Sequence, residues 1–284
     1  MHQEATAERL DKLVSAYSSS WEHNARSASL FSILGNDRNH DAWREQDFFD
    51  AGSEEVGRVL RFMETSGIRL QNFSSFLDFG CGVGRNTRAL IGEFKSGVGV
   101  DIATNMIADA VRFAKDDERQ ARYVVNKEAN LGFVAEGSID FVYCHMVLQH
   151  NPAPLQQAYI AEFLRVLSPG GVAAFQIPTG QYARNLVEAI KQAIPPRAKV
   201  VVRSLMGAKT RSEMHVLPAS AIEDICAAGG TKILASQYTN STHPNHEGRI
   251  EFMSREAAIS RIKNGATPSY HLSQFFFVQK SPAR

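Results

Sequence analysis

The chain has 284 residues, of which 44% are hydrophobic, enough to bury one large core. Its formal net charge of +1 gives no general attraction to nucleic acid or to an acidic membrane surface. No run of about 18 apolar residues occurs, and the N-terminus lacks a basic-then-apolar signal pattern. The cysteines Cys81, Cys144 and Cys226 are far apart, so neither a zinc site nor a disulfide framework is indicated. We therefore expect a cytoplasmic protein without a bound metal.

Residues 1–75 are predicted to form a helical cap ahead of a sheet. A first helix is expected over Ala5 to Tyr17, where apolar residues recur at helical spacing. A second is predicted to begin with Ser53 as its N-cap and to end at Gly67. Its apolar stripe consists of Val56, Val59, Leu60 and Met63. Four aromatic residues of the cap are interpreted as core packing rather than pocket lining, namely Trp21, Trp43, Phe48 and Phe49.

The central motif of the sequence is a short apolar strand followed by three glycines at alternate positions. Phe76, Leu77 and Phe79 supply the strand, and a helical pattern begins near Asn86. The glycines between them are Gly80, Gly82 and Gly84. A strand, a glycine loop and a helix in this order bring backbone N–H groups and a helix N-terminus close to a nucleotide-like ligand.

Two acids narrow the choice of ligand. Asp101 ends a second predicted strand and is placed to accept both hydroxyls of a ribose. Asp78 directly precedes the glycine loop, where a carboxylate disfavours a pyrophosphate. Moreover, the third glycine of a dinucleotide-binding G-x-G-x-x-G motif would fall on Arg85. The acids favour S-adenosylmethionine, which combines an ammonium group, a sulfonium and an adenosine, over a nicotinamide dinucleotide.

The segment from about 74 to 178 resembles the class I S-adenosylmethionine-dependent methyltransferases. Five pieces carry the resemblance: Leu77–Gly84, Gly99–Asp101, Gly137–Val142, Val147–His150 and Arg165–Gly171. The resemblance implies an α/β, Rossmann-like, seven-stranded, mostly parallel sheet with an antiparallel edge hairpin and helices on both faces. The methyltransferase domain would span residues 76–284, with a helical insert at about 179–215.

The remaining elements follow from periodicity and turn residues. Further strands are expected at Ala121–Val125, Ser138–His145, Gly171–Ile177 (ended by Pro178), Thr231–Tyr238 and His271–Lys280. Helices are expected at Thr104–Lys115, Pro152–Leu167, Pro218–Ala228 and Arg255–Lys263. The last two strands would form the edge hairpin.

The resemblance also implies a set of cofactor-binding residues. Asp78 and the loop Gly80, Cys81, Gly82 and Gly84 would hold the methionine part, and Asp101 would hold the ribose. Ile102 and Met106 would flank the adenine, with Asn126 near its edge. Arg85 is expected to reach the methionine carboxylate. His145, at the end of the fourth strand, is expected to pack or hydrogen-bond near the cofactor.

A methyl acceptor that carries a proton also needs a base near the methyl group. His150 is the first candidate, with Gln149 as an orienting group; its alternative role is structural, as a helix cap or a partner of a loop carbonyl. His215 is the second candidate. The pair His243 and His246 is interpreted as surface histidines, because no third metal ligand at suitable spacing accompanies it.

The acceptor is expected to be a small molecule methylated on oxygen or nitrogen. Asn151-Pro152-Ala153 departs from the Asn-Pro-Pro-aromatic signature of amino methyltransferases, so a nucleic-acid base is not expected. The insert at 179–215 carries seven basic residues against two acidic ones. It is interpreted either as a solvated lid or as a cap that attracts an anionic acceptor. Two alternatives remain open: methylation of a sugar or lipid-linked saccharide, and regulatory S-adenosylmethionine binding without transfer.

Overall fold

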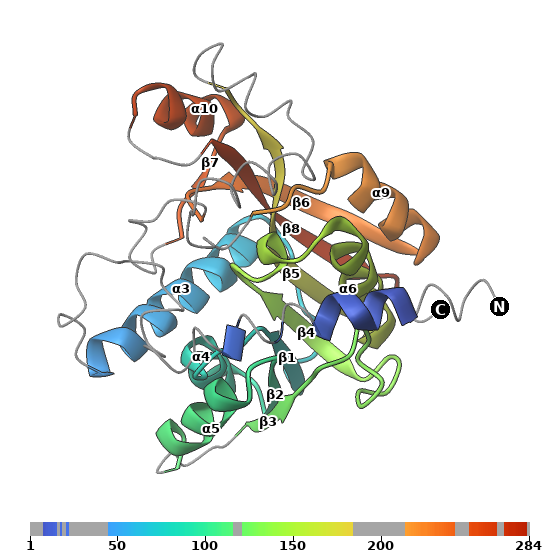
Figure 1. The fold of residues 1–284 in the computed structure, drawn as a ribbon. Helices are drawn as coiled ribbons and strands as arrows, with labels where there is room; N and C mark the ends of the chain where they lie inside the picture. Colours follow the sequence, from blue (N-terminus) through green and yellow to red (C-terminus); the bar gives the residue numbers. More distant parts are fainter. Residues whose placement is uncertain are drawn as a thin grey trace, which may run out of the picture.

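A computed structural model describes residues 8–15, 18, 21–22, 45–115, 121–183, 214–241, 250–265 and 270–282. These residues build an eight-stranded sheet in the order β3-β2-β1-β4-β5-β8-β6-β7 (Figure 1). The strands are β1 Ser75–Phe79, β2 Ser96–Asp101, β3 Arg122–Val125, β4 Ile139–Cys144, β5 Leu167–Gln181, β6 Thr231–Thr239, β7 Phe252–Met253 and β8 His271–Lys280.

The strand directions confirm the predicted class of sheet. β1 to β5 pair in parallel, whereas β8 runs antiparallel between β5 and β6. Seven strands match the predicted set, and the two-residue β7 extends the edge beyond β6. β6 therefore points the same way as β4 and β5, so that its carboxyl end reaches the same edge of the sheet.

Helices cover both faces of the sheet (Figure 1). They are α3 Glu45–Thr65, α4 Arg85–Glu93, α5 Thr104–Phe113, the short 3₁₀ helix η1 Leu148–His150, α6 Ala153–Val166, α9 Ala219–Ala228 and α10 Arg255–Lys263. α3, α4 and α5 lie on one side, and α6, α9 and the helical residues 8–15 lie on the other. Val14 of that N-terminal segment is fully buried against the α6 side, as the predicted amphipathic spacing requires.

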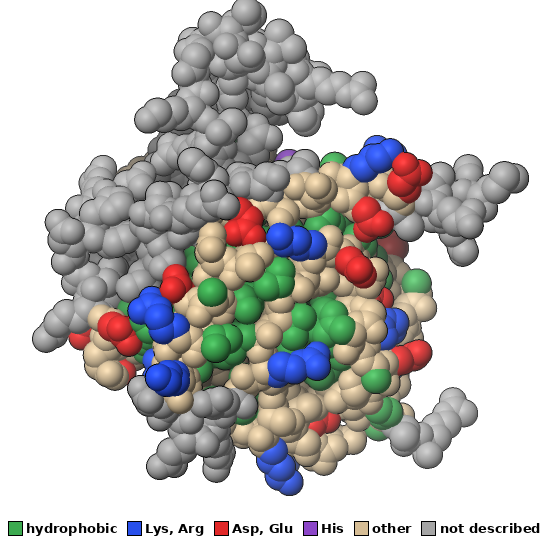
Figure 2. Space-filling model, turned by 60° about the horizontal axis from the view of Figure 1, so that its bottom comes forward, with side chains coloured by type: hydrophobic (Ala, Val, Ile, Leu, Met, Phe, Trp, Pro, Cys, Tyr) green, Lys and Arg blue, Asp and Glu red, His purple; other side chains and the backbone are tan. Residues whose placement is uncertain are grey.

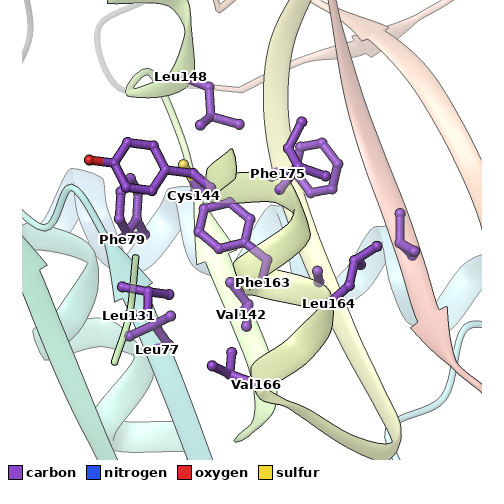
Figure 3. Packing of buried hydrophobic residues seen from close by; sticks show 14 of the residues in the cluster. Leu77, Phe79, Leu131, Val142, Cys144, Leu148, Phe163, Leu164, Val166 and Phe175 are labelled. Atoms are coloured by element: carbon purple, nitrogen blue, oxygen red, sulfur yellow. The ribbon is translucent and has the colours of Figure 1, made fainter. Parts of the chain in front are cut away.

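Two hydrophobic layers fix the sheet. On the α6 side, Phe163 and Leu164 pack over Leu77, Val142 and Phe175 of the central strands (Figure 3). On the α3 side, a largely aromatic layer underlies the helices and consists of Phe76, Phe94, Phe141, Tyr143, Phe275 and Phe277. Since successive side chains of a strand point to opposite faces, the near-continuous apolar strands of this sequence supply both layers.

Three predicted boundaries were wrong, one of them the start of β5, which is Leu167 rather than Gly171. Ser53 is not an N-cap, because α3 already runs from Glu45 and the Ser53 hydroxyl donates to the Phe49 carbonyl at 3.4 Å inside the helix. Phe48 and Phe49, both buried, extend the apolar face of α3 upstream of the predicted start. β5 does not stop at Pro178 but continues to Gln181. Among the described residues β8 is the one strand that borders β5 beyond Phe175. The Pro178 carbonyl accepts from the Leu217 N–H and so points away from β8, and the Pro178 nitrogen, on the same side of the strand, needs no N–H for the ladder.

The acidic and basic side chains on the face shown in Figure 2 are interspersed, without one sign dominating. None of the described helices is long and apolar enough to cross a membrane. The described residues also contain no group of three or more potential metal ligands.

Some of the predictions fall outside the described residues. They concern His243, His246, Trp43 and most of the insert at 179–215. The proposed domain division stays a prediction.

Candidate active site

The carboxyl ends of β1 and β4 lie side by side at the point where the strand order reverses. β1 pairs with β2 on one side and with β4 on the other, and ligands of open α/β sheets bind in the crevice at such a point. The glycine loop occupies this position. Gly80, Gly82 and Gly84 have φ values of 77°, 53° and 85°, all in the left-handed region. The alternate glycines of the sequence are therefore required by the backbone of the loop.

Asp101 ties the end of β2 to the glycine loop. One carboxylate oxygen accepts from the Gly82 N–H at 2.9 Å and the other from the Ala103 N–H at 2.9 Å. Burial raises the pKa of Asp101, and these backbone hydrogen bonds oppose that effect. The residue remains partly exposed at the mouth of the loop.

Asp78 lies beneath the same loop with 2% of its surface exposed. Its carboxylate accepts a hydrogen bond from the Thr87 hydroxyl at 2.6 Å. Burial raises the pKa of Asp78 to about 7; Thr87 lowers it, and the neighbouring carboxylate of Glu55 raises it further. A pKa this high means that the neighbouring groups do not offset the cost of burying the ionised carboxylate. A bound cation would offset that cost.

Glu55 of α3 is the charged residue that sequence reasoning missed. It is fully buried, and its carboxylate accepts from Arg85 at 2.8 Å, Asn86 at 2.9 Å, the Tyr143 hydroxyl at 2.7 Å and His145 Nδ1 at 2.8 Å. Burial alone would raise the pKa of Glu55, but Arg85 and His145 hold it well below its usual range. Glu55 thereby joins α3, the start of α4 and the end of β4.

Arg85 is 4% exposed and directs its Nη2 toward Glu55. Its Nε and Nη1 are buried and have no hydrogen-bond partner among the described residues. Because buried polar groups are nearly always paired, these two donors mark a place for an anionic group. The predicted role of Arg85 toward a methionine carboxylate stays a prediction, and its pairing with Glu55 is a second role that the sequence did not indicate.

His145 is held from both sides. Its Nδ1 lies 2.8 Å from Glu55 and its Nε2 lies 2.8 Å from the Ser241 hydroxyl, while its side chain is 1% exposed. Both ring nitrogens are therefore occupied by protein groups. The predicted proximity of His145 to a cofactor is not tested by these contacts.

Both candidate bases contact Gln149, His150 through its ring and His215 through its backbone. His150 lies 3.2 Å from the Gln149 amide nitrogen, and its ring meets the edge of Trp21 at 5.2 Å between centroids. The His215 backbone N–H donates to the Gln149 carbonyl at 2.7 Å. Both histidines are half-buried beyond the end of β4, and their roles stay predictions.

The residues predicted around an adenine occupy the exits of β2 and β3. Met106 is buried in a small cluster with Val83 and Ala103, against which Trp21 packs. Ile102 packs on the edge of the α6-side core. The Asn126 amide group donates to the carbonyl of Asn130 at 2.9 Å and so closes its own loop. Cys81 is buried, and burial raises the pKa of its thiol well above the usual value.

A polar cluster joins the end of β4 to β5 and β8, and of its members the sequence analysis had singled out Gln149 alone. The buried Gln176 side chain accepts from the Met146 N–H at 3.0 Å and donates to Gln149 at 3.1 Å and to the Ser273 hydroxyl. Met146 is the described non-glycine residue with a positive φ, 61°. Backbone strain of this kind is concentrated at functional sites, and Met146 lies beside the β1–β4 crevice.

A sequence model of a methyltransferase domain matches residues 76–171. Residues 76–171 therefore belong to a class I S-adenosylmethionine-dependent methyltransferase domain. Trans-aconitate 2-methyltransferase of Azoarcus sp. (strain BH72) is 29% identical over 140 residues, which cover 48% of this chain and 51% of that protein. The chain thus matches about half the length of this relative.

Solved structures share the fold of this methyltransferase domain. Magnesium protoporphyrin IX methyltransferase from Synechocystis PCC 6803, with bound S-adenosylmethionine, superposes with a TM-score of 0.54 at 15% identity, covering 93% of this chain and 97% of that chain. The (4+2)-cyclase SpnF superposes with a TM-score of 0.51 at 14% identity, covering 78% and 82%. At such identities the likeness establishes the fold alone, and the cyclase shows that the fold does not dictate the reaction.

Gly80→Ala should disrupt the methyltransferase loop. A Cβ at Gly80 would lie 2.1 Å from Val147 Cγ2, and the φ of 77° disfavours any side chain. We expect a lower melting temperature and loss of S-adenosylhomocysteine binding, measured by thermal unfolding and calorimetry. Gly92→Ala in α4 is the matched control, because a Cβ there meets nothing within 4 Å. It should stabilise the helix by about 0.5–1 kcal/mol. Unchanged binding in Gly80→Ala would show that the loop does not contact the cofactor.

Proposed function

We propose that the chain transfers a methyl group from S-adenosylmethionine to an oxygen or nitrogen of a small, polar acceptor. The observation that carries this proposal is the pair of acids around the glycine loop. Asp78 is buried and poorly compensated beneath the loop, and Asp101 stands partly exposed at its mouth. A ligand with a cation at one end and vicinal hydroxyls at the other complements this pair.

The residues present fit the cofactor. Asp78 would receive the ammonium group, and the N–H groups of the loop from Gly80 to Gly84 would face the methionine part. Asp101 would accept from the ribose, and Ile102, Met106 and Ala103 would border the adenine. The Nε and Nη1 of Arg85, which have no partner in the described part of the chain, offer donors to the methionine carboxylate. When bound, the cofactor supplies an activated methyl group, so positioning and exclusion of water are what the chain must add.

The acceptor is proposed to be anionic. The relative from Azoarcus is named for trans-aconitate, and the predicted basic insert would favour a negatively charged molecule. The buried amide and hydroxyl groups of Gln149, Gln176 and Ser273 form a polar neighbourhood for such a molecule beyond β4. The first alternative is methylation of a sugar or lipid-linked saccharide. The second is binding of S-adenosylmethionine without methyl transfer, and the cyclase that shares the fold gives a reason to test it.

The proposed activity is tested by following conversion of S-adenosylmethionine to S-adenosylhomocysteine over time with a panel of acceptors. The panel should contain tricarboxylic acids, hydroxy acids, phosphorylated amines and sugars. Acceptor-dependent product, with a methylated acceptor detected by mass spectrometry, is expected for at least one anionic compound. Tight S-adenosylhomocysteine binding without product from any acceptor would instead indicate a regulatory binder.

A further inference from the structure

The most unusual feature beyond the cofactor loop is a row of hydrogen-bonded side chains from three distant parts of the chain. It runs from Thr239 at the end of β6 through Ser241 and His145 to Glu55 in α3. The consecutive distances are 2.9 Å between the two hydroxyls, 2.8 Å from Ser241 to His145 Nε2, and 2.8 Å from His145 Nδ1 to Glu55. All four residues are buried, with Ser241 1% exposed and Glu55 fully enclosed.

With a neutral His145 ring, the hydrogen bonds of this row fit a single direction of donation. Glu55 is ionised at neutral pH, so its carboxylate can only accept and His145 Nδ1 must donate. In a neutral ring the Nε2 atom is then an acceptor, and its partner is the Ser241 hydroxyl. The Ser241 oxygen in turn accepts from the Thr239 hydroxyl. Serine, histidine and carboxylate thus stand in the order in which a base activates a hydroxyl group.

Stability alone does not account for this arrangement. Burying an ionised carboxylate with its partners is often no better for stability than packing apolar side chains of similar size. The row also ends at the functional edge of the sheet. His145 immediately precedes the strained Met146, and β6 points the same way as β4, so Ser241 lies on the edge that holds the glycine loop.

We propose that Ser241, acting through His145 and Glu55, takes the proton from the methyl acceptor, whose reacting group is therefore a hydroxyl or an amine. This proposal rests on the proposed methyl transfer. The acceptor proton moves to Ser241 Oγ as the serine proton moves to His145 Nε2. The acceptor–carbon bond forms as the sulfur–carbon bond breaks, and that electron pair stays on sulfur. Glu55 compensates the positive charge that develops on the ring. Ser241 is the catalytic residue, and His145 and Glu55 are positioning residues.

The direction of the hydrogen bonds can be tested without turnover. In protein labelled with ¹⁵N-histidine at pH 8, His145 should show a protonated Nδ1 and an unprotonated Nε2. The signal is assigned by its disappearance in His145→Gln, and Glu55→Gln should shift it. A ring protonated on Nε2 would overturn the proposal, because it could not accept the serine proton.

Kinetics provide the second test. Ser241→Ala should lower kcat by about 10²–10⁴ while leaving the Kd of S-adenosylhomocysteine within a few fold of the parent. Ser241→Thr keeps the hydroxyl and should recover much of the rate. Ser236→Ala, at an exposed serine of β6, the strand that precedes Ser241, should leave the rate unchanged. His150→Ala provides the comparison with the base predicted from the sequence.

The outcomes separate this proposal from the proposed function. A parent protein that methylates no acceptor overturns both. Transfer that survives Ser241→Ala, or that is lost only in His150→Ala, overturns the Ser241 proposal and leaves methyl transfer standing. A carboxylate acceptor has no proton to lose. If the substrate is methylated on a carboxylate oxygen, the role of Ser241 as proton acceptor is therefore also contradicted.

Discussion

Replacing Glu55 by alanine is expected to lower the free energy of unfolding by about 3–5 kcal/mol, the usual cost of removing one partner of a buried ion pair. The change would leave the Arg85 guanidinium buried at 4% exposure without its carboxylate. It would also remove the shared acceptor of Tyr143, Asn86 and His145. Urea unfolding at pH 7 measures the effect as a lower midpoint with an unchanged slope.

Glu64→Ala is the matched control for this prediction. Glu64 lies in the same helix but is exposed, so the same substitution should change the free energy of unfolding by no more than about 0.5 kcal/mol. Equal effects of the two substitutions would contradict the role of Glu55 as the charged link between α3, α4 and β4.

Asp78→Asn is expected to stabilise the ligand-free protein at pH 8 and to weaken cofactor binding. The pKa of Asp78 is about 7 in the folded protein, against an ordinary value of 3.8 for an aspartate. The protonated carboxyl therefore favours the folded state at low pH, and this contribution is lost as the pH rises from about 4 to 7. Since one pKa unit corresponds to about 1.4 kcal/mol, the loss reaches at most roughly 4 kcal/mol above pH 7.

Asparagine does not ionise, so its variant does not lose stability as the pH rises. Its side-chain oxygen can still accept a hydrogen bond from the Thr87 hydroxyl. The variant should therefore exceed the parent by about 1–4 kcal/mol at pH 8, with the difference shrinking as the pH falls toward 4. Its affinity for S-adenosylhomocysteine should fall by about 1–3 kcal/mol, because the ammonium group loses a charged partner. A stability difference that does not depend on pH would show that Asp78 is not the titrating group.

Local patterns in the sequence predicted much of the sheet and the loop. The Phe76 to Phe79 strand, the glycines and Asp101 are close in sequence, and their roles follow from backbone geometry and turn chemistry. α10 occupies the predicted range, Arg255–Lys263, with Ser254 as its cap. The start of α3 and the end of β5 were wrong because buried aromatic residues and a free strand edge outweighed local capping and proline signals.

The Glu55 network could not be predicted from local signals, because hydrogen-bonded partners within it lie up to 96 positions apart along the chain. With Ser53 as the predicted N-cap, Glu55 would lie in the exposed first turn of the helix, whereas α3 already includes Glu45. One signal was available: Glu55 lies three residues after the buried Gly52 and four before Val59, and so shares the buried face of α3. Ser241 and the strained Met146 gave no sequence signal that distinguished them from ordinary loop residues.

Calorimetric titration of the parent protein with S-adenosylhomocysteine, with NAD as the comparison ligand, tests the central claim most directly. S-adenosylhomocysteine should bind at one site and more tightly at pH 8 than at pH 6, because a cationic ammonium group prefers the ionised form of Asp78, whose pKa is about 7. NAD should produce no binding heat. Binding of NAD with none of S-adenosylhomocysteine would contradict the assignment of this loop and its two acids to S-adenosylmethionine.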